Sequence, residues 1–355
     1  MTRVISAKAP SARSIPSTTS PSPMFYTATN SDHRAGTLPA DALKKITQSI
    51  HHDGFAVVGN LVSQETRDIL LPTVLEDADI VRSGGELTPH EQRTAPGHLQ
   101  LGLRHTAPFV RADLVANPLI ESVVAAVLGE GAWLGFYNGN VNCPGSGEQP
   151  LHFDRPYSWR TVEEAKEDGQ DWPPPTTTLS CSVALTEITE ESGATEIYPG
   201  SQRETEVATW TTNRLGDRTD LTDAWGPPAR MEIPAGGVCF RDPRMWHRGV
   251  PNHADAPRPM LAVTYHAAIA HHWRGRYERH MSAEDLARCQ ADSRLKMMDS
   301  GELADGRLVF HESTRPIFSA ASEHGINRNV RFVTGTVDHL HSAHEVGGAA
   351  VIPTP

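Results

Sequence analysis

The amino-acid sequence predicts a mainly β domain with flanking helices, built on a double-sheet jelly roll. One observation is that short alternating runs, separated by Gly, Pro and Asn, fill the chain from Trp133 onward. Another is that helical periodicity dominates only the first third of the chain. A third is that strands and helices do not alternate repeatedly, as they do around a parallel sheet. Together these observations favour a jelly roll over a parallel α/β sheet.

Residues 1–37 are expected to form a disordered tail. The first 31 residues contain three basic and no acidic residues, among many Ser, Thr and Pro. An organelle transit peptide is the alternative, but Pro10, Pro16, Pro21 and Pro23 would interrupt the amphipathic helix that such a peptide needs. The sequence therefore favours a tail, and cytoplasm is the expected compartment.

The helices of the first third are predicted from apolar spacing and from capping residues. Apolar side chains recur at helical spacing over residues 38–53, and Gly54 ends that helix. Residues 55–58 then read as a strand. Ser63 caps a second helix with its hydroxyl, and a third helix covers residues 117–127.

Two runs in the second half alternate as half-buried strands do, one over residues 179–186 and the other over residues 261–266. A late helix over residues 283–298 and a strand over residues 330–333 are expected to pack against the barrel. The pattern shows no internal repeat, so we expect a single domain over residues 38–341.

Charge and cysteine content exclude several classes of protein. The net charge of −11 argues against binding to a nucleic-acid backbone, which requires clustered Lys and Arg. The four cysteines contain no CxxC pair and are interpreted as buried small residues in a reducing compartment. No apolar run approaches the ~20 residues that cross a bilayer. We expect a soluble protein that acts on a small molecule, without nucleic acid or membrane as partner.

A His-x-Asp pair is the first sign of a metal site, because two histidines and one carboxylate can hold an iron that activates dioxygen. The pair occurs three times, at residues 51–53, 152–154 and 253–255. The first lies at a helix end and the third in a Pro- and Asn-rich turn, so both are interpreted as solvated. His152 and Asp154 stand at a strand terminus and form the candidate pair.

The third ligand must come from a distant strand. Residues 236–247 offer a strand, a turn and then His247, which lies 93 residues beyond Asp154. Arg258 follows eleven residues later and opens the next alternating strand. Its guanidinium can hold a dicarboxylate through a bidentate pair, which lysine does not match.

Two long polar connections, residues 160–175 and 202–228, interrupt the strand pattern on either side of candidate ligands. Loops of this length are either disordered or functional, and these two are candidate lids over a substrate. Their tryptophans are interpreted as anchors that pin the loops to the sheet. A loose tail is expected over residues 342–355.

These segments resemble the phytanoyl-CoA dioxygenase-like family of Fe(II)- and 2-oxoglutarate-dependent oxygenases. The matching motifs are residues 149–154, residues 192–201, and residues 246–252 with Arg258. Residues 53–58 are similar to the opening helix-to-strand step of that family. The resemblance spans roughly residues 38–270 and implies a double-stranded β-helix, a cupin-like jelly-roll core.

The resemblance implies that His152, Asp154 and His247 bind Fe(II), and that Arg258 pairs with the distal carboxylate of 2-oxoglutarate. Dioxygen is the second co-substrate. Related halogenases carry Gly or Ala at the position of Asp154, so halogenation is disfavoured here.

Thr195 and Gln149 are further expectations from the resemblance. Thr195 is similar to a hydroxyl that assists the distal carboxylate, and Gln149 to an amide that contacts the co-substrate. The alternatives are a strand threonine satisfied in its ladder and a solvent-exposed glutamine. Two positions depart from the family: Gln202, where His is common, and Ala254, where Ser is frequent. Neither is a metal ligand.

The implied activity is hydroxylation of a C–H bond of a small organic metabolite, with release of succinate and CO2. One alternative is a zinc hydrolase or cupin-type isomerase with the same three ligands, which Arg258 disfavours. The other is a relative that binds a small molecule without turnover. Acidic residues in the first candidate lid favour a neutral or cationic substrate over a highly anionic thioester; they are Glu163, Glu164, Glu167 and Asp168.

Overall fold

The computed structural model describes most of the chain from residue 24 to residue 267, together with the backbone of residues 278–281 and 308–311. Short gaps interrupt the long stretch, at residues 84, 102–107, 110, 130–131, 158, 160, 206–213, 216–221 and 224. No helix in this described part is long and apolar enough to cross a membrane.

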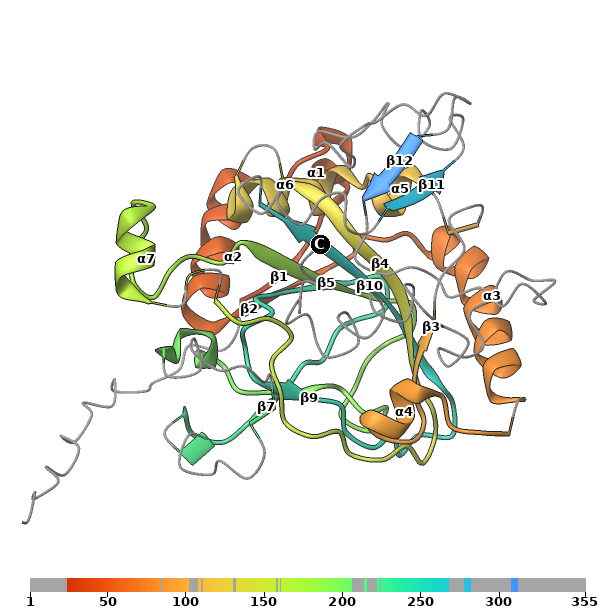
Figure 1. The fold of residues 1–355 in the computed structure, drawn as a ribbon. Helices are drawn as coiled ribbons and strands as arrows, with labels where there is room; N and C mark the ends of the chain where they lie inside the picture. Colours follow the sequence, from red (N-terminus) through yellow and green to blue (C-terminus); the bar gives the residue numbers. More distant parts are fainter. Residues whose placement is uncertain are drawn as a thin grey trace, which may run out of the picture.

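A seven-stranded sheet forms the centre of the molecule (Figure 1). Its neighbouring strands are antiparallel, except that β1 and β2 are parallel. In spatial order the strands are β1 (Phe25–Thr27), β2 (Phe55–Gly59), β8 (Val238–Arg241), β5 (Thr178–Ala184), β10 (Arg258–His266), β4 (Trp133–Asn142) and β3 (His98–Leu101).

A second, smaller sheet has the order β7-β6-β9, formed by Ala229–Arg230, Glu196–Ile197 and His247–Arg248. Isolated bridges extend it: His152 pairs with His247 and with Arg214, and Ile188 pairs with Ile233. The predicted fold class, mainly β with a double-sheet jelly-roll core and flanking helices, is confirmed.

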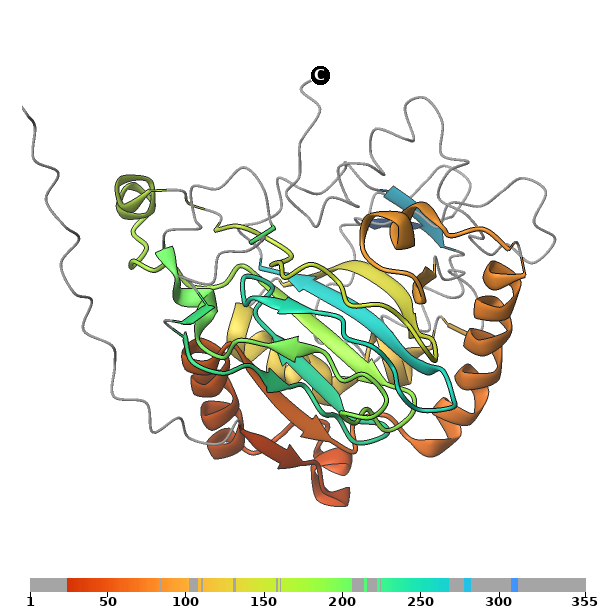
Figure 2. The same ribbon diagram turned by 90° about the horizontal axis from the view of Figure 1, so that it is seen from below.

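Helices cover the outer face of the large sheet, and α2 and α3 flank it at opposite ends (Figure 2). Their buried apolar side chains join those of β5 and β10 in the main core. The helices are α1 (Asn30–Ala35), α2 (Ala40–Asp53), α3 (Gln64–Arg82), α4 (Pro89–Arg93), α5 (Ala112–Val115), α6 (Pro118–Leu128) and α7 (Val162–Glu167), with a short 3-10 turn η1 (Ser201–Arg203).

The predicted helix limits in the first third are confirmed. Gly54 ends α2 in a left-handed conformation with φ of 90°, where a side chain would also collide with Gln202. The Ser63 hydroxyl accepts a hydrogen bond from Thr66 N at 3.1 Å at the start of α3. Asn117 caps α6 in the same way.

The expectation that residues 1–37 are all disordered is wrong in its last part, because β1 and α1 lie within it. β1 pairs with β2, and α1 begins with a capping box between Thr29 and Asp32. A three-residue strand gives almost no periodic signal, and its partner residues lie 32 positions away in the sequence, as Phe25 and Val57 do. Residues 1–23 lie outside the described part.

The strands β5 and β10 are buried on both faces rather than half-buried as predicted. Leu179, Cys181 and Val183 pack into the helix-covered core, whereas Ser180 and Ser182 line a cavity between the two sheets. The polar face therefore serves a site and not bulk solvent. The helix expected over residues 283–298 and the strand over residues 330–333 lie outside the described residues; nearby, β11 (Glu278–Met281) pairs with β12 (Leu308–His311).

Candidate metal centre and co-substrate pocket

Three predicted ligands meet between the sheets. His152 and His247 are opposite each other in an antiparallel bridge, with His152 N to His247 O at 3.0 Å and His247 N to His152 O at 2.8 Å. Opposed residues project to the same face, and so does a residue two positions further along an extended segment, here Asp154. This geometry explains the His-x-Asp spacing, because residues two positions apart in an extended segment share a face.

The donor atoms of these three residues lie within 4.8 Å of one another. Asp154 Oδ1 is 3.4 Å from His247 Nε2 and 3.8 Å from His152 Nε2. Among the described residues they are the one group of three or more His, Cys, Asp or Glu side chains that converges in this way. Two imidazoles and one carboxylate suit a ferrous ion that keeps open positions.

Backbone carbonyls orient both imidazoles. His152 Nδ1 lies 2.8 Å from Pro150 O, and His247 Nδ1 lies 2.9 Å from Met245 O. A protonated Nδ1 donates to each carbonyl, which leaves the Nε2 lone pairs directed at Asp154. Burial, with the adjacent His247, lowers the pKa of His152 to about 3, so its ring is neutral, as a metal ligand must be.

Arg241, at the end of β8, is a site residue that the sequence analysis did not assign. Its Nη2 donates to Asp154 Oδ2, and its side chain is 8% exposed. Burial by itself raises the pKa of Asp154, but the electrostatic effects of the adjacent His247 and of the Arg241 guanidinium outweigh this and hold that pKa well below its ordinary value. Asp154 therefore presents Oδ1 to the histidines while Arg241 holds Oδ2.

Arg241 also packs against a metal-site ring, since its Nη1 lies 3.2 Å from His247 Nδ1. Because that nitrogen already donates to Met245 O, the contact does not add a hydrogen bond. One signal for Arg241 is present in the sequence: a charged residue closes the apolar run Val238–Phe240, directly before the turn that leads to His247.

A cavity of about 250 Å³ adjoins the three convergent side chains, and the predicted co-substrate residues line it. Arg258, the first residue of β10, is 4% exposed and donates from Nη2 to Gly193 O at 2.9 Å. Its Nε has no hydrogen-bond partner among the described residues. Burial lowers the pKa of Arg258 to about 10. A buried guanidinium with a free donor fits the carboxylate of 2-oxoglutarate.

Thr195 and Gln149 line the same cavity. Thr195 is buried, and its backbone carbonyl accepts a hydrogen bond from Met231 N. Gln149 is half-buried, and its Oε1 accepts a hydrogen bond from Gly249 N at 3.0 Å. This bond fixes the amide orientation and leaves Nε2 as a donor for the cavity.

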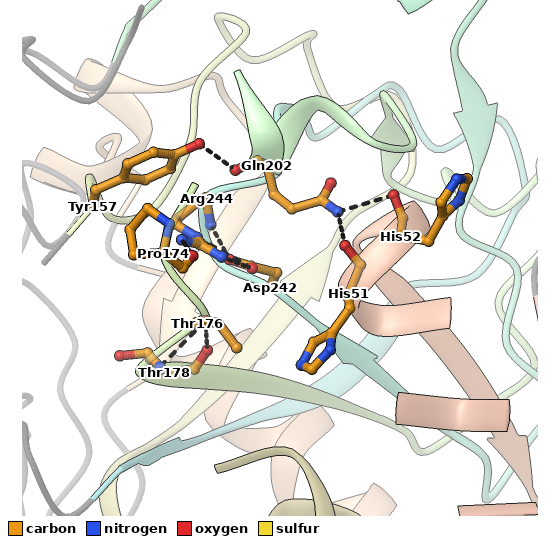
Figure 3. Close-up of polar contacts among 9 residues, drawn as sticks. All are labelled: His51, His52, Tyr157, Pro174, Thr176, Thr178, Gln202, Asp242 and Arg244. Atoms are coloured by element: carbon orange, nitrogen blue, oxygen red, sulfur yellow. Dashed lines mark hydrogen bonds and ion pairs between the residues drawn. The ribbon is translucent and has the colours of Figure 1, made fainter. Parts of the chain in front are cut away.

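A buried polar network holds the turn before His247 (Figure 3). Arg244 pairs with Asp242 and donates from Nη1 to Pro174 O at 2.6 Å. Its guanidinium also lies 4.7 Å from the centre of the Tyr157 ring. The network thus ties the ligand-bearing turn to the segment that was predicted as the first lid.

Gln202 extends this network to α2 (Figure 3). Tyr157 donates from its hydroxyl to Gln202 O at 2.9 Å, and Gln202 Nε2 donates to His51 O at 3.1 Å and His52 O at 3.2 Å. The residue that departs from the family pattern therefore caps the C-terminus of α2 and does not enter the cavity.

The other two His-x-Asp pairs lie outside the cavity. His51, His253 and Asp255 are exposed, whereas Asp53 is half-buried and contacts the exposed His52.

Of the tryptophans predicted to pin the loops to the sheet, Trp225 packs edge-on against Trp246, which precedes β9. Trp159 donates to Asp168 and Trp172 packs edge-on against Tyr157, and both contacts stay within the segment around the first connection. The first candidate lid carries α7, and the second is described only in part.

The family model described as phytanoyl-CoA dioxygenase (PhyH) matches residues 50–260, which is more than half of the chain. The chain belongs to the phytanoyl-CoA dioxygenase family. This family member is an oxidoreductase of the dioxygenase type, and its cofactors are iron and the co-substrate 2-oxoglutarate. The donor set of two histidines and one carboxylate, together with the free Nε of Arg258, fits both groups.

Curated relatives include dioxygenases of fungi and bacteria. Dioxygenase trt7 of Aspergillus terreus is 26% identical over 167 residues, which cover 46% of this chain and 56% of the relative. Ectoine dioxygenase of Bordetella bronchiseptica is 26% identical over 288 residues, which cover 75% of this chain and 89% of the relative.

Solved structures with a similar fold include the non-heme alpha ketoglutarate dependent carbocyclase SnoK from nogalamycin biosynthesis. It has a TM-score of 0.48 and 20% identity, with coverage of 63% of this chain and 84% of SnoK. EctD from S. alaskensis with 2-oxoglutarate and 5-hydroxyectoine has a TM-score of 0.45 and 19% identity, with coverage of 65% and 76%.

Proposed function

We propose that this chain hydroxylates a C–H bond of a small organic metabolite, using Fe(II) held by His152, Asp154 and His247. The observation that carries the proposal is that these three donor side chains and the buried guanidinium of Arg258 line one cavity. Bound iron would activate dioxygen at the expense of 2-oxoglutarate, which is converted to succinate and CO2.

Arg258 has the role of binding the distal carboxylate of 2-oxoglutarate in this proposal. The free Nε–H of this buried guanidinium can donate to a carboxylate oxygen. Thr195 adds a hydroxyl for the same carboxylate, and Gln149 offers its amide Nε2. Pairing with the carboxylate of 2-oxoglutarate would offset the free-energy cost of burying the charge of Arg258. This gain would add to the affinity for the co-substrate.

Arg241 has a positioning role in the same proposal. Because it holds Asp154 Oδ2, a single oxygen of the carboxylate is left for the metal. A carboxylate that uses one oxygen occupies one coordination position, which leaves room for the co-substrate and dioxygen. The two carbonyl-bound imidazoles complete a fixed set of ligands.

The size of the cavity favours a small substrate, or a small part of a substrate, close to the metal. Its volume of about 250 Å³ must hold 2-oxoglutarate and the reacting part of the substrate together. A zinc hydrolase would use the same three ligands, but it has no need of the Arg258 fork in the same cavity. The relatives that are named dioxygenases favour the oxygenase reading.

Anaerobic titration with Fe(II) and 2-oxoglutarate tests the proposal, because their chelate absorbs visible light. We expect a charge-transfer band in the wild type and its loss in Asp154→Ala and Arg258→Ala. Asp255→Ala is the matched control, since it removes the aspartate of an exposed His-x-Asp pair and should leave the band intact. A wild type without a band, or site variants that keep it, would contradict the assignment.

A further inference from the structure

We propose that Arg248 and Glu196 are positioning residues of the co-substrate site and act through a row of alternating charges on the smaller sheet. The row, called the charge row, consists of Glu148, Arg248, Glu196 and Arg230. The inference rests on the proposed function, because it takes 2-oxoglutarate as an occupant of the cavity. It adds which side chains hold the groups for that co-substrate in place.

The backbone register places the charges of the row side by side. In the smaller sheet, Glu196 of β6 is opposite Arg248 of β9 on one side and opposite Arg230 of β7 on the other. Opposed residues project to the same face of a sheet. The carboxylate of Glu196 therefore lies between two guanidinium groups.

Arg248 joins two carboxylates. Its Nε donates to Glu196 Oε1 at 2.7 Å, and its Nη1 donates to Glu148 Oε1 at 2.6 Å. The side chain of Glu196 is only 7% exposed, and its Oε2 lies 3.7 Å from Arg230 Nη2. Glu148, at the end of the row, is exposed. The central pair of Arg248 and Glu196 is therefore screened less by solvent and salt than an exposed pair.

Each member of the charge row is next in sequence to a residue that lines the cavity, although none of the four lines it. Successive side chains of a strand point to opposite faces, so a charge on one face fixes the backbone that carries a cavity residue on the other. In the order of the row, these neighbours are Gln149, His247, Thr195 and Met231.

The backbone alone holds these segments together over a short length. β6 pairs with β9 through two residue pairs and with β7 through two, whereas β5 and β10 pair through seven in the large sheet. Cross-strand pairs of opposite charge stabilise a sheet, and they matter most where few backbone pairs exist. Without the central ion pair, the groups of Thr195 and Gln149 should face the co-substrate correctly in a smaller fraction of molecules, which lowers the apparent affinity.

The metal ligand His247 has supports that do not depend on the charge row. Its backbone forms the bridge with His152, and its Nδ1 lies 2.9 Å from Met245 O. Loss of the row should therefore weaken the binding of 2-oxoglutarate more than the binding of the metal. This difference separates a positioning role from a general loss of structure, which would weaken both.

Titration of the Mn(II)-loaded protein with 2-oxoglutarate, followed by calorimetry, tests the proposal. Arg248→Gln and Glu196→Gln each remove the central ion pair and should raise the dissociation constant of 2-oxoglutarate about three- to tenfold. Arg248→Lys keeps the charge but lacks the planar fork, so its rise should be smaller. The dissociation constant of Mn(II) should change by less than about twofold in all three variants.

Glu190→Gln is the matched control. Glu190 is exposed, its carboxylate lies 3.9 Å from Arg230, and neither of its sequence neighbours lines the cavity. The variant removes the same charge as Glu196→Gln and should leave the affinity for 2-oxoglutarate unchanged. Thermal unfolding shows which variants are folded during the titration. If Glu196→Gln does not fold, Glu148→Gln tests the exposed end of the row and should raise the dissociation constant about twofold.

A double-mutant cycle connects the charge row to Thr195. In the Thr195→Ala background, Glu196→Gln should weaken 2-oxoglutarate binding much less than it does in the wild type, because the hydroxyl that it positions is already absent. A residue that only stabilises the fold would instead give additive effects.

Several results would overturn the proposal. They are Arg248→Gln and Glu196→Gln variants that bind 2-oxoglutarate as tightly as the wild type, equal losses of Mn(II) and 2-oxoglutarate affinity, and an additive cycle with Thr195→Ala. A wild type that does not bind 2-oxoglutarate contradicts the proposed function and the positioning role together. Normal binding in the wild type with unchanged variants contradicts the positioning role alone, so the two failures are distinguishable.

Discussion

Arg244 and Arg258 are both buried between the sheet and its loops, yet their surroundings differ in the number of partners. Arg244 pairs with Asp242, donates to Pro174 O and stacks on Tyr157. Burial lowers its pKa, but the charge and hydrogen bonds of Asp242 outweigh this effect, so the pKa of Arg244 stands above its ordinary value. The charge of Arg244 is satisfied within the chain.

Arg258 has one hydrogen bond, to Gly193 O, and its Nε is without a partner in the described structure. Burial lowers its pKa to about 10, and no opposite charge among the described residues offsets that effect. The comparison shows that burial alone does not separate a structural arginine from a functional one. The partners do, because an incomplete set of partners for a buried charge indicates a ligand from outside the chain.

The largest effect is expected from Arg258→Met. Loss of a buried ion pair with 2-oxoglutarate should raise the dissociation constant of the co-substrate about 100- to 1,000-fold, as calorimetry would measure. Without 2-oxoglutarate, the free energy of unfolding should stay equal or increase, because an unpaired buried charge is removed. Arg258→Lys should recover only part of the affinity, since it lacks the fork. A marked loss of stability in Arg258→Met would contradict this prediction, because Arg258 would then be a structural residue like Arg244.

Arg244→Met should show the reverse pattern. The variant leaves Asp242 buried without its counter-charge, so the free energy of unfolding should fall by about 3–5 kcal/mol in chemical denaturation. The 2-oxoglutarate affinity of the folded protein should change little, because Arg244 does not line the cavity. The double variant Arg244→Met with Asp242→Asn should regain much of the stability. Retained stability in the single variant would show that the network is not needed for folding.

The sequence located the three converging side chains, two of them through a local relation. His152 and Asp154 share a face through the two-residue period of an extended segment, and the strand-turn-histidine pattern located His247. Arg258 was predicted for a similar reason, as the residue that opens an alternating strand. Local pattern was also sufficient for the helices capped by Ser63 and Asn117.

The role of Arg241 could not be predicted, because it depends on contacts between distant strands. Whether an arginine at the end of β8 faces the cavity follows from its pairing with Phe55 on one side and Ser180 on the other. The same limitation explains the missed strand β1, which forms only against β2. The position of Arg214 in the cavity wall could not be predicted either, because it depends on a bridge between His152 and a long connection.

Arg241 stands between the two extremes of the comparison, because it faces the cavity but is paired with Asp154. Arg241→Met should leave Asp154 free to bind a metal through both oxygens, and metal affinity should fall about 10- to 100-fold, as for other residues that orient ligands. Mn(II) titration measures the affinity, and the visible spectrum of the Co(II) form reports the coordination number. Arg241→Lys should restore most of the affinity, because it keeps a cationic donor near Oδ2. If the Met variant keeps both the affinity and the Co(II) spectrum of the wild type, Arg241 is a structural residue like Arg244, and the metal site is oriented by the backbone carbonyls alone.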